Sequence, residues 1–210
     1  MPSGNYYVPL NLNSPLRSAF YLAADGTSQT TTAIQSIYVF VQHTSAPGNV
    51  TYATADSASI RCDSSTLFGT QGPGCVFPDY APTFDTLSVS DPAVNETAQH
   101  IQTARQTLPD HWGSYALGGP PLSRLTDAAK RKRNYNAACG NFVPDPTKPN
   151  DTCDEYPFQS TYQGAWYCPG RTSIAHVDGM DNSTAGGRLG AFYAANRILD
   201  QDQFWVYINP

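Results

Sequence analysis

Short apolar stretches alternate with small polar residues along the first 90 residues of the chain. Three stretches rich in tyrosine, valine, isoleucine and phenylalanine are separated by clusters of asparagine, serine, glycine and threonine, which is typical of strands joined by turns. The predicted strands lie at 6–12, 18–24 and 34–42. The third contains the nearly continuous apolar run SIYVFV, as expected of a strand that is covered on both faces.

The pattern changes to helical spacing near residue 91. Asp91 can cap a helix with Pro92 in its first turn. The apolar face of this helix recurs at Val94, Ala98, Ile101 and Ala104 or Arg105. The segment 108–121 is rich in glycine and proline and indicates a linker. We therefore expect a β-rich N-terminal region at 1–110 and a second domain at 111–210.

The second domain alternates between helical and strand-like patterns. Its predicted elements are a helix at 122–138, a strand at 172–177, a helix at 183–199 and a strand at 203–208. Thr126 or Asp127 would lie near the start of the first helix, and Asp181 or Asn182 would open the second. The fold class predicted for the chain is α+β.

Composition favours an extracellular, loop-rich protein. Only 14% of the 210 residues are charged, well below the usual quarter, and the chain has 17 prolines and 13 tyrosines. No apolar run approaches the roughly 18 residues that a membrane span needs, so no membrane partner is expected. The opening MPSGNYYVPL lacks the pattern of a signal peptide, so an exported protein would be represented here by its mature part.

The five cysteines also favour an extracellular location. Cys62 and Cys75 bracket a loop rich in glycine and serine, and Cys139 and Cys153 bracket one rich in proline and asparagine. A disulfide across such a loop contributes about 3 kcal/mol. Cys168 is left over, either as a buried thiol or as a competitor in another pairing. No cysteine has the spacing of a zinc site.

Charge argues against bulk electrostatic binding of nucleic acid, because the formal net charge is −5. A local basic strip nevertheless occurs at 130–133, on the exposed side of a predicted helix. Arg131 and Arg133 in this strip can contact backbone phosphates. Arg188 is a further candidate for a phosphate contact, although arginines on helix surfaces are common.

Two segments contain residues suited to hydrolytic chemistry. Asp154 and Glu155 are adjacent, so in a strand one would face a metal or water while the other supports the site. By their spacing alone, they are more typical of a turn with two solvated acids. Asp181 and Asn182 suit a helix cap, yet an amide oxygen there can also face a cation. Gly186 and Gly187 would each weaken the first turn of this helix by about 1 kcal/mol relative to alanine, so a packed backbone or a ligand is expected close by.

The order of these parts is that of a one-metal β-β-α nuclease site: an acidic strand, a second strand, and a helix that opens with asparagine. Hydrolysis of a phosphodiester needs a base for water and a cation that neutralises the growing charge. Carboxylate and amide oxygens suit one divalent ion, Mg²⁺ or Mn²⁺. Glu155, Asn182 and Asp181 are therefore the predicted metal ligands.

The segments 153–165 (CDEYPFQSTYQGA) and 181–208 (DNSTAGGRLGAFY and onward) resemble the NucA/NucB family of deoxyribonucleases, secreted enzymes of bacteria and fungi. The actinobacterial branch is the most similar. The resemblance extends more loosely upstream and covers about residues 57–208. It implies a secreted, metal-dependent endodeoxyribonuclease that acts on DNA with little sequence preference, as a monomer.

The resemblance also implies roles for matching positions. Asp154 and Glu155 match the acidic pair, of which one would be the general base. Gln163 stands where many members have glutamate, which weakens a role as ligand. In the motif NYNAAC, Asn134 is a candidate substrate contact, and Tyr135 replaces the usual arginine.

Histidine is the usual base in related metal-dependent nucleases. Of His43, His100, His111 and His176, only His176 lies between the two motifs, so it is the candidate catalytic histidine; a strand histidine with an ordinary hydrogen bond is the alternative. Two other functions stay open. One is a binding module that keeps the scaffold without activity, and the other is a toxin domain with an immunity or inhibitor protein as its partner. Carbohydrate binding by the β-rich region is suggested only by its aromatic content.

Overall fold

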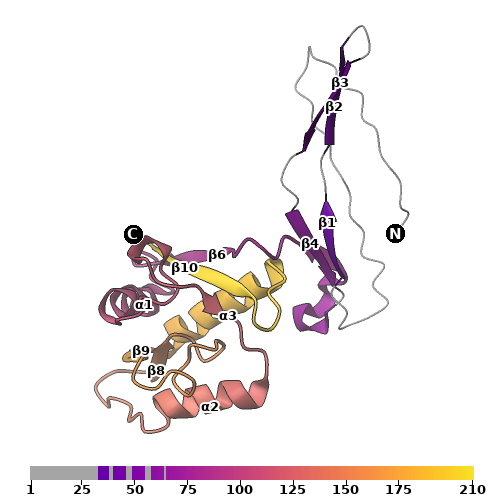
Figure 1. Ribbon diagram of the computed structural model, residues 1–210. Helices are drawn as coiled ribbons and strands as arrows, with labels where there is room; N and C mark the ends of the chain where they lie inside the picture. The colour runs from indigo at the N-terminus through magenta and orange to yellow at the C-terminus, as the bar shows by residue number, and fades with distance from the viewer. Residues whose placement is uncertain (1–32, 38–39, 46–48, 55–57, 64) are drawn as a thin grey trace.

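The computed structural model describes residues 33–37, 40–45, 49–54, 58–63 and 65–210 (Figure 1). The first strands form two small antiparallel sheets. In one, β4 (Ala58–Asp63) lies between β1 (Ala33–Ile37) and β5 (Gly74–Val76); in the other, β2 (Phe40–Ser45) pairs with β3 (Asn49–Thr54). The predicted strand at 34–42 thus falls on two strands, β1 and β2, which join different sheets. The strands predicted at 6–12 and 18–24 lie outside the described residues.

A disulfide closes the segment between β4 and β5. Cys62 and Cys75 are directly opposite in the antiparallel pair and are bonded, as predicted. Between them lies the 3-10 helix η1 (Thr66–Gln71), whose first turn is capped by the Ser65 hydroxyl. We call residues 62–75 the cystine loop.

A three-stranded sheet follows, with the order β6–β10–β7. The long strand β10 (Gln203–Asn209) pairs in parallel with β6 (Thr83–Ser88) and antiparallel with β7 (Leu122–Ser123). Alternate residues of β10 are buried on one face, as the period of a strand requires. The strand predicted at 203–208 is therefore present.

Three helices match the helical patterns of the sequence. α1 (Asn95–Thr107) buries the predicted apolar face. α2 (Ala128–Cys139) begins later than predicted, because Asp127 caps it after the chain has formed β7. α3 (Gly179–Ala195) begins earlier than predicted, because the Asp178 carboxylate accepts hydrogen bonds from its first turn. None of the helices in the described part of the chain is both long enough and apolar enough to span a membrane.

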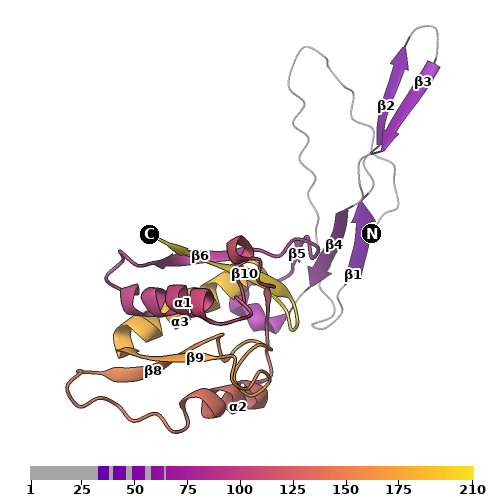
Figure 2. The same cartoon turned by 60° about the vertical axis from the view of Figure 1, so that its left-hand side comes forward.

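An antiparallel pair of strands, β8 (Asp151–Tyr156) and β9 (Ser173–Asp178), completes the fold. Figure 2 shows the resulting layers: the β6–β10 sheet, then α1 and α3, then the β8–β9 pair, and α2 on the far side of that pair. A second disulfide, Cys139–Cys153, ties the end of α2 to β8 as predicted, and Cys168 is a half-buried free thiol.

One hydrophobic core joins the sheet to α1 and α3. Its buried residues are Phe84, Leu87, Val94, Ala98, Ile101, Ala104, Leu122, Tyr156, Ala185, Leu189, Phe192, Tyr193, Ile198, Phe204, Val206 and Ile208. The domain boundary predicted at 110/111 stays a prediction. The core nevertheless draws on both sides of it, and the Gly- and Pro-rich segment at 108–121 packs against this core, since Gly113 bonds to β10.

Candidate active site

Two adjacent buried carboxylates on β8 lie in different surroundings. Asp154 is 5% exposed and faces α1, while Glu155 is 9% exposed and lies beside the disulfide at the end of α2. Their directions differ because neighbouring residues of a strand point to opposite faces. The fold thus gives the two acids different partners and allows them different roles.

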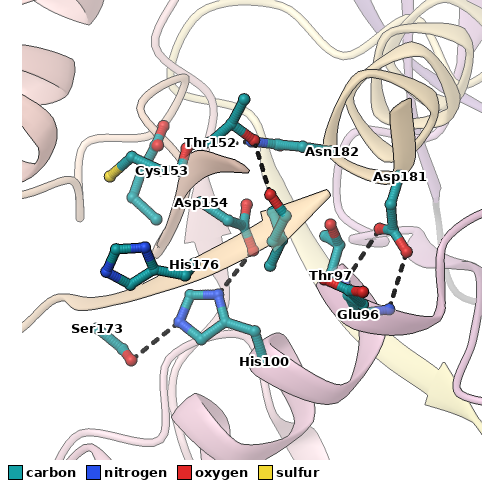
Figure 3. A network of polar contacts seen from close by, with 12 residues as sticks. Glu96, Thr97, His100, Thr152, Cys153, Asp154, Ser173, His176, Asp181 and Asn182 are labelled. Carbon is teal, nitrogen blue, oxygen red and sulfur yellow. Dashed lines mark hydrogen bonds and ion pairs between the residues drawn. The ribbon is translucent and has the colours of Figure 1, made fainter. Parts of the chain in front are cut away.

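Asp154 is held by a histidine of α1. Nδ1 of His100 lies 2.6 Å from the Asp154 carboxylate, and Nε2 of the same ring lies 2.9 Å from the Ser173 hydroxyl (Figure 3). Burial raises the pKa of Asp154, and its hydrogen bond to His100 opposes that rise. The ring therefore fixes the carboxylate between α1 and the β8–β9 pair.

The Glu155 carboxylate has weaker hydrogen-bond partners than the Asp154 carboxylate. One carboxylate oxygen accepts a hydrogen bond of 3.2 Å from the backbone N–H of Gln159. Burial, with a smaller contribution from the charge of Asp154, raises the pKa of Glu155 to about 8. Near neutral pH its carboxyl is thus protonated in the protein alone. A cation bound beside it would favour the ionised form.

The start of α3 lies against β8 through Asn182. The amide Nδ2 donates to the Cys153 carbonyl at 3.0 Å and to the Thr152 hydroxyl at 3.3 Å (Figure 3). The nitrogen of the amide is used in this way, while its oxygen accepts no hydrogen bond among the described residues. Asn182 therefore offers an oxygen beside the acidic strand.

Asp181 faces a different way from its neighbour. Its two carboxylate oxygens accept hydrogen bonds of 2.8 and 3.1 Å from the backbone N–H groups of Glu96 and Thr97, at the start of α1 (Figure 3). Successive helical residues diverge by about 100°. Asp181 thus caps α1, and both of its oxygens have protein donors.

A cleft of about 310 Å³ opens in front of these groups. Asp154, Glu155 and residues 158–160 form its floor, and α2 and α3 form its sides. The side chains and glycines that line it include Thr97, Arg124, Arg131, Tyr135, Asn182, Gly186, Gly190 and Tyr193.

The α3 side of the cleft is built from small residues. Asn182, Gly186 and Gly190 recur every four residues and so share one face of the helix. No heavy atom lies within 4 Å of a Cβ built on either glycine. The protein backbone therefore does not explain these glycines, and their open face leaves room for a ligand.

Several oxygen donors that line the cleft suit a hard cation. Glu155 supplies a carboxylate and Asn182 an amide oxygen, and the buried hydroxyl of Thr97 has no hydrogen-bond partner among the described residues. Sulfur atoms of Cys139 and Cys153 lie within 4.8 Å of the Glu155 carboxylate, but the disulfide joins them and leaves no thiolate. The set that fits an ion is thus made of oxygens, as Mg²⁺ and Mn²⁺ prefer.

The candidate catalytic histidine, His176, lies outside the cleft. Its side chain is 46% exposed, and Nδ1 lies 2.7 Å from the carboxylate of Asp151. Its ring packs against Phe142, with 4.5 Å between centroids. The arrangement corresponds to the alternative interpretation, a strand histidine with an ordinary hydrogen bond.

Four further predicted residues also lie outside the cleft lining. Gln163 accepts a hydrogen bond from a backbone N–H of β7, and Arg188 forms an ion pair with Asp91. Asn134 is 1% exposed and uses its amide to hold the loop at 159–166 against α2. Arg133 is exposed on α2 over the Trp166 ring. Of the predicted phosphate contacts, Arg131 alone lines the cleft.

Sequence reasoning did not assign a role to several residues of the site. Arg124, Tyr193 and Thr97 line the cleft, and His100 holds Asp154. The signal for His100 was its place beside the apolar face of a regular helix. Its partner lies 54 residues further along the chain, a distance at which spacing carries no information.

A comparison with known protein families supports the chemistry that this geometry suggests. The family model for deoxyribonuclease NucA/NucB matches residues 119–207. The match includes α2, β8, β9 and α3, the elements that carry both acids, Asn182 and the glycine face. No curated protein matches the chain. Residues 119–207 are therefore similar to the deoxyribonuclease NucA/NucB family.

Proposed function

We propose that this protein is a divalent-metal-dependent endodeoxyribonuclease and that the cleft in front of Glu155 is its active site. The observation that carries the proposal is the position of Glu155: a buried carboxylate at the floor of a cleft, with arginine on one side and an open helical face on the other. Basic groups attract the phosphate backbone, and the open face gives it space.

One divalent ion, Mg²⁺ or Mn²⁺, would be held by Glu155 and Asn182. When bound, the ion supplies positive charge for the phosphodiester and for the oxygen that leaves. We do not include Asp181 among the ligands, because both of its oxygens cap α1.

Asp154 is the proposed general base. It lines the cleft, and its raised pKa makes it a better proton acceptor near neutral pH than an ordinary aspartate. His100 binds one carboxylate oxygen and so keeps the other in a fixed direction. His100 is accordingly a positioning residue.

Little sequence preference is expected of this cleft. Its basic side chains are arginines, and together with the basic strip of α2 they suit the phosphates that every DNA sequence shares. The two disulfides are typical of an oxidising compartment, so we propose that the enzyme acts outside the cell, as a monomer.

The test is nicking of supercoiled plasmid by the full chain with Mg²⁺ or Mn²⁺, with and without EDTA. Wild type should nick in either ion and stop in EDTA, whereas Glu155→Gln and Asp154→Asn should each lose at least two orders of magnitude. Asp85→Asn, which changes an exposed acid on β6, is the matched control and should keep full activity. A folded wild type that binds DNA without nicking it contradicts the proposal and favours a binding module.

A further inference from the structure

Arg124, just after β7, presents its guanidinium in the cleft between two aromatic rings. The guanidinium carbon lies 4.5 Å from the centroid of Tyr193 and 5.9 Å from that of Phe68. Stacking of this kind fixes the plane of a guanidinium and leaves its edge free for hydrogen bonds. The same residue lines the cleft whose floor holds Glu155.

The N–H groups of Arg124 are mostly unused. One nitrogen, Nη1, donates to the Ile198 carbonyl, and Arg124 forms no ion pair among the described residues. The nearby acids have other partners: Asp202 binds Arg61, and Asp200 binds Thr126. A guanidinium has five N–H donors, so most of those of Arg124 have no acceptor among the described residues.

A second arginine lies close to the first. Arg131 of α2 lines the same cleft and also forms no ion pair within the described part of the chain. Burial lowers the pKa of Arg124, and the neighbouring charge of Arg131 contributes in the same direction, whereas Tyr193, Asp202 and Asp200 oppose this shift. Two unpaired cations that share a cleft repel each other, and an anion placed between them would relieve that repulsion.

The ring beneath Arg124 belongs to the cystine loop, which lies outside the matched family region. Phe68 is 4% exposed, and its other neighbour is Arg197, whose guanidinium carbon lies 4.8 Å from the ring centroid. Arg197 in turn binds the Asp63 carboxylate, with one contact of 2.5 Å, and the Gly72 carbonyl. The loop is thus fastened near the end of α3 by a buried ion pair and a hydrogen bond, and its Phe68 ring lies against Arg124.

We propose that Arg124 is a phosphate-binding residue of the cleft and that Phe68 of the cystine loop holds its guanidinium in place. The ligand is a phosphodiester of the DNA strand, bound by the free edge of Arg124 and by Arg131, on the side of the cleft away from Asn182. The inference rests on the proposed nuclease function. It makes the cystine loop part of the substrate site.

The experiment measures binding of a short fluorescent DNA duplex to the full chain by anisotropy, in EDTA, over a series of KCl concentrations. Arg124→Met should weaken binding about tenfold and reduce the slope of log Kd against log salt by about one, the loss expected for one phosphate contact. Arg188→Met is the matched control, because Arg188 pairs with Asp91 outside the cleft, and it should bind like wild type.

Phe68 is tested by a double-mutant cycle. Phe68→Ala should weaken DNA binding several-fold in the wild-type background and have no effect once Arg124 is methionine. Phe68→Leu replaces it if the alanine variant does not melt cooperatively.

Three outcomes overturn the inference: Arg124→Met with a wild-type salt slope, a wild type without salt-dependent binding, or a folded Phe68 variant with unchanged affinity. These outcomes are separate from the plasmid test. A wild type that nicks DNA while Arg124→Met binds normally refutes only the phosphate site.

Discussion

Replacing Glu155 with glutamine should make the protein more stable while it destroys activity. The folded chain holds the pKa of Glu155 at about 8, against an ordinary value of 4.5. Between these values the unfolded chain releases a proton that the folded chain keeps, so the free energy of unfolding of wild type falls as pH rises through this window. A shift of this size corresponds to several kcal/mol. Glutamine keeps an oxygen that accepts from the Gln159 N–H, but it does not titrate, so the pH-dependent loss of stability disappears.

The assay is urea unfolding of wild type and Glu155→Gln in EDTA, from about pH 4 to pH 9. The two proteins should be equally stable near pH 4, and the variant should become more stable by several kcal/mol as pH rises to about 8, with no further change above that. Asp85→Asn, an exposed substitution, should differ from wild type by a constant amount. Saturating Mn²⁺ should stabilise wild type and leave Glu155→Gln unaffected. A difference between wild type and Glu155→Gln that does not vary with pH refutes the reasoning.

His100→Ala should lower the free energy of unfolding by about 3 kcal/mol, because it leaves Asp154 buried without its ring partner; it should also slow plasmid nicking, and an unchanged urea midpoint would disprove the pairing. Gly186→Leu should raise stability by up to about 1 kcal/mol through helix propensity, yet cut nicking at least tenfold, because its side chain enters the cleft. Gly187→Leu, one residue along and outside the cleft lining, should give the same gain in stability without the loss, and equal activity of the two variants would contradict the glycine face. Removal of the divalent ion with EDTA should lower the melting temperature of wild type reversibly, and a melting temperature independent of the ion would argue against binding in the cleft.

Periodicity predicted α1, α3 and the last strand because one face of each is buried. The spacing of Val94, Ala98 and Ile101 in α1 reflects a helix packed on a single core, and all three are buried. The two disulfides could be predicted because each closes a short loop within one stretch of chain. Local patterns of this kind are present in the sequence itself.

Contacts that form only in the folded chain could not be predicted from such local patterns. His176 was favoured for its place between the two motifs, yet the period of two along β9 buries Val177 and turns His176 to solvent. Asp181 and Asn182 are neighbours in sequence, but the helical turn between them sends one to α1 and the other to β8. His100, on α1, supplies the contact to Asp154 instead.

The role of the Gly- and Pro-rich segment at 108–121 also could not be predicted from the sequence. Its composition indicated a linker, although glycine there serves close packing. Gly113 has a φ of +73°, and a Cβ at this position would lie 2.6 Å from the Tyr156 hydroxyl. Composition alone does not distinguish a flexible connection from a tight turn in the core.

The most direct test of the central claim is the position of a bound ion. Crystals of the full chain soaked in Mn²⁺ should show one anomalous peak in the cleft, within bonding distance of the Glu155 carboxylate and beside the Asn182 amide, and Glu155→Gln crystals should lose it. A peak at any other place in crystals of a chain that nicks DNA, with none beside Glu155, would contradict the account.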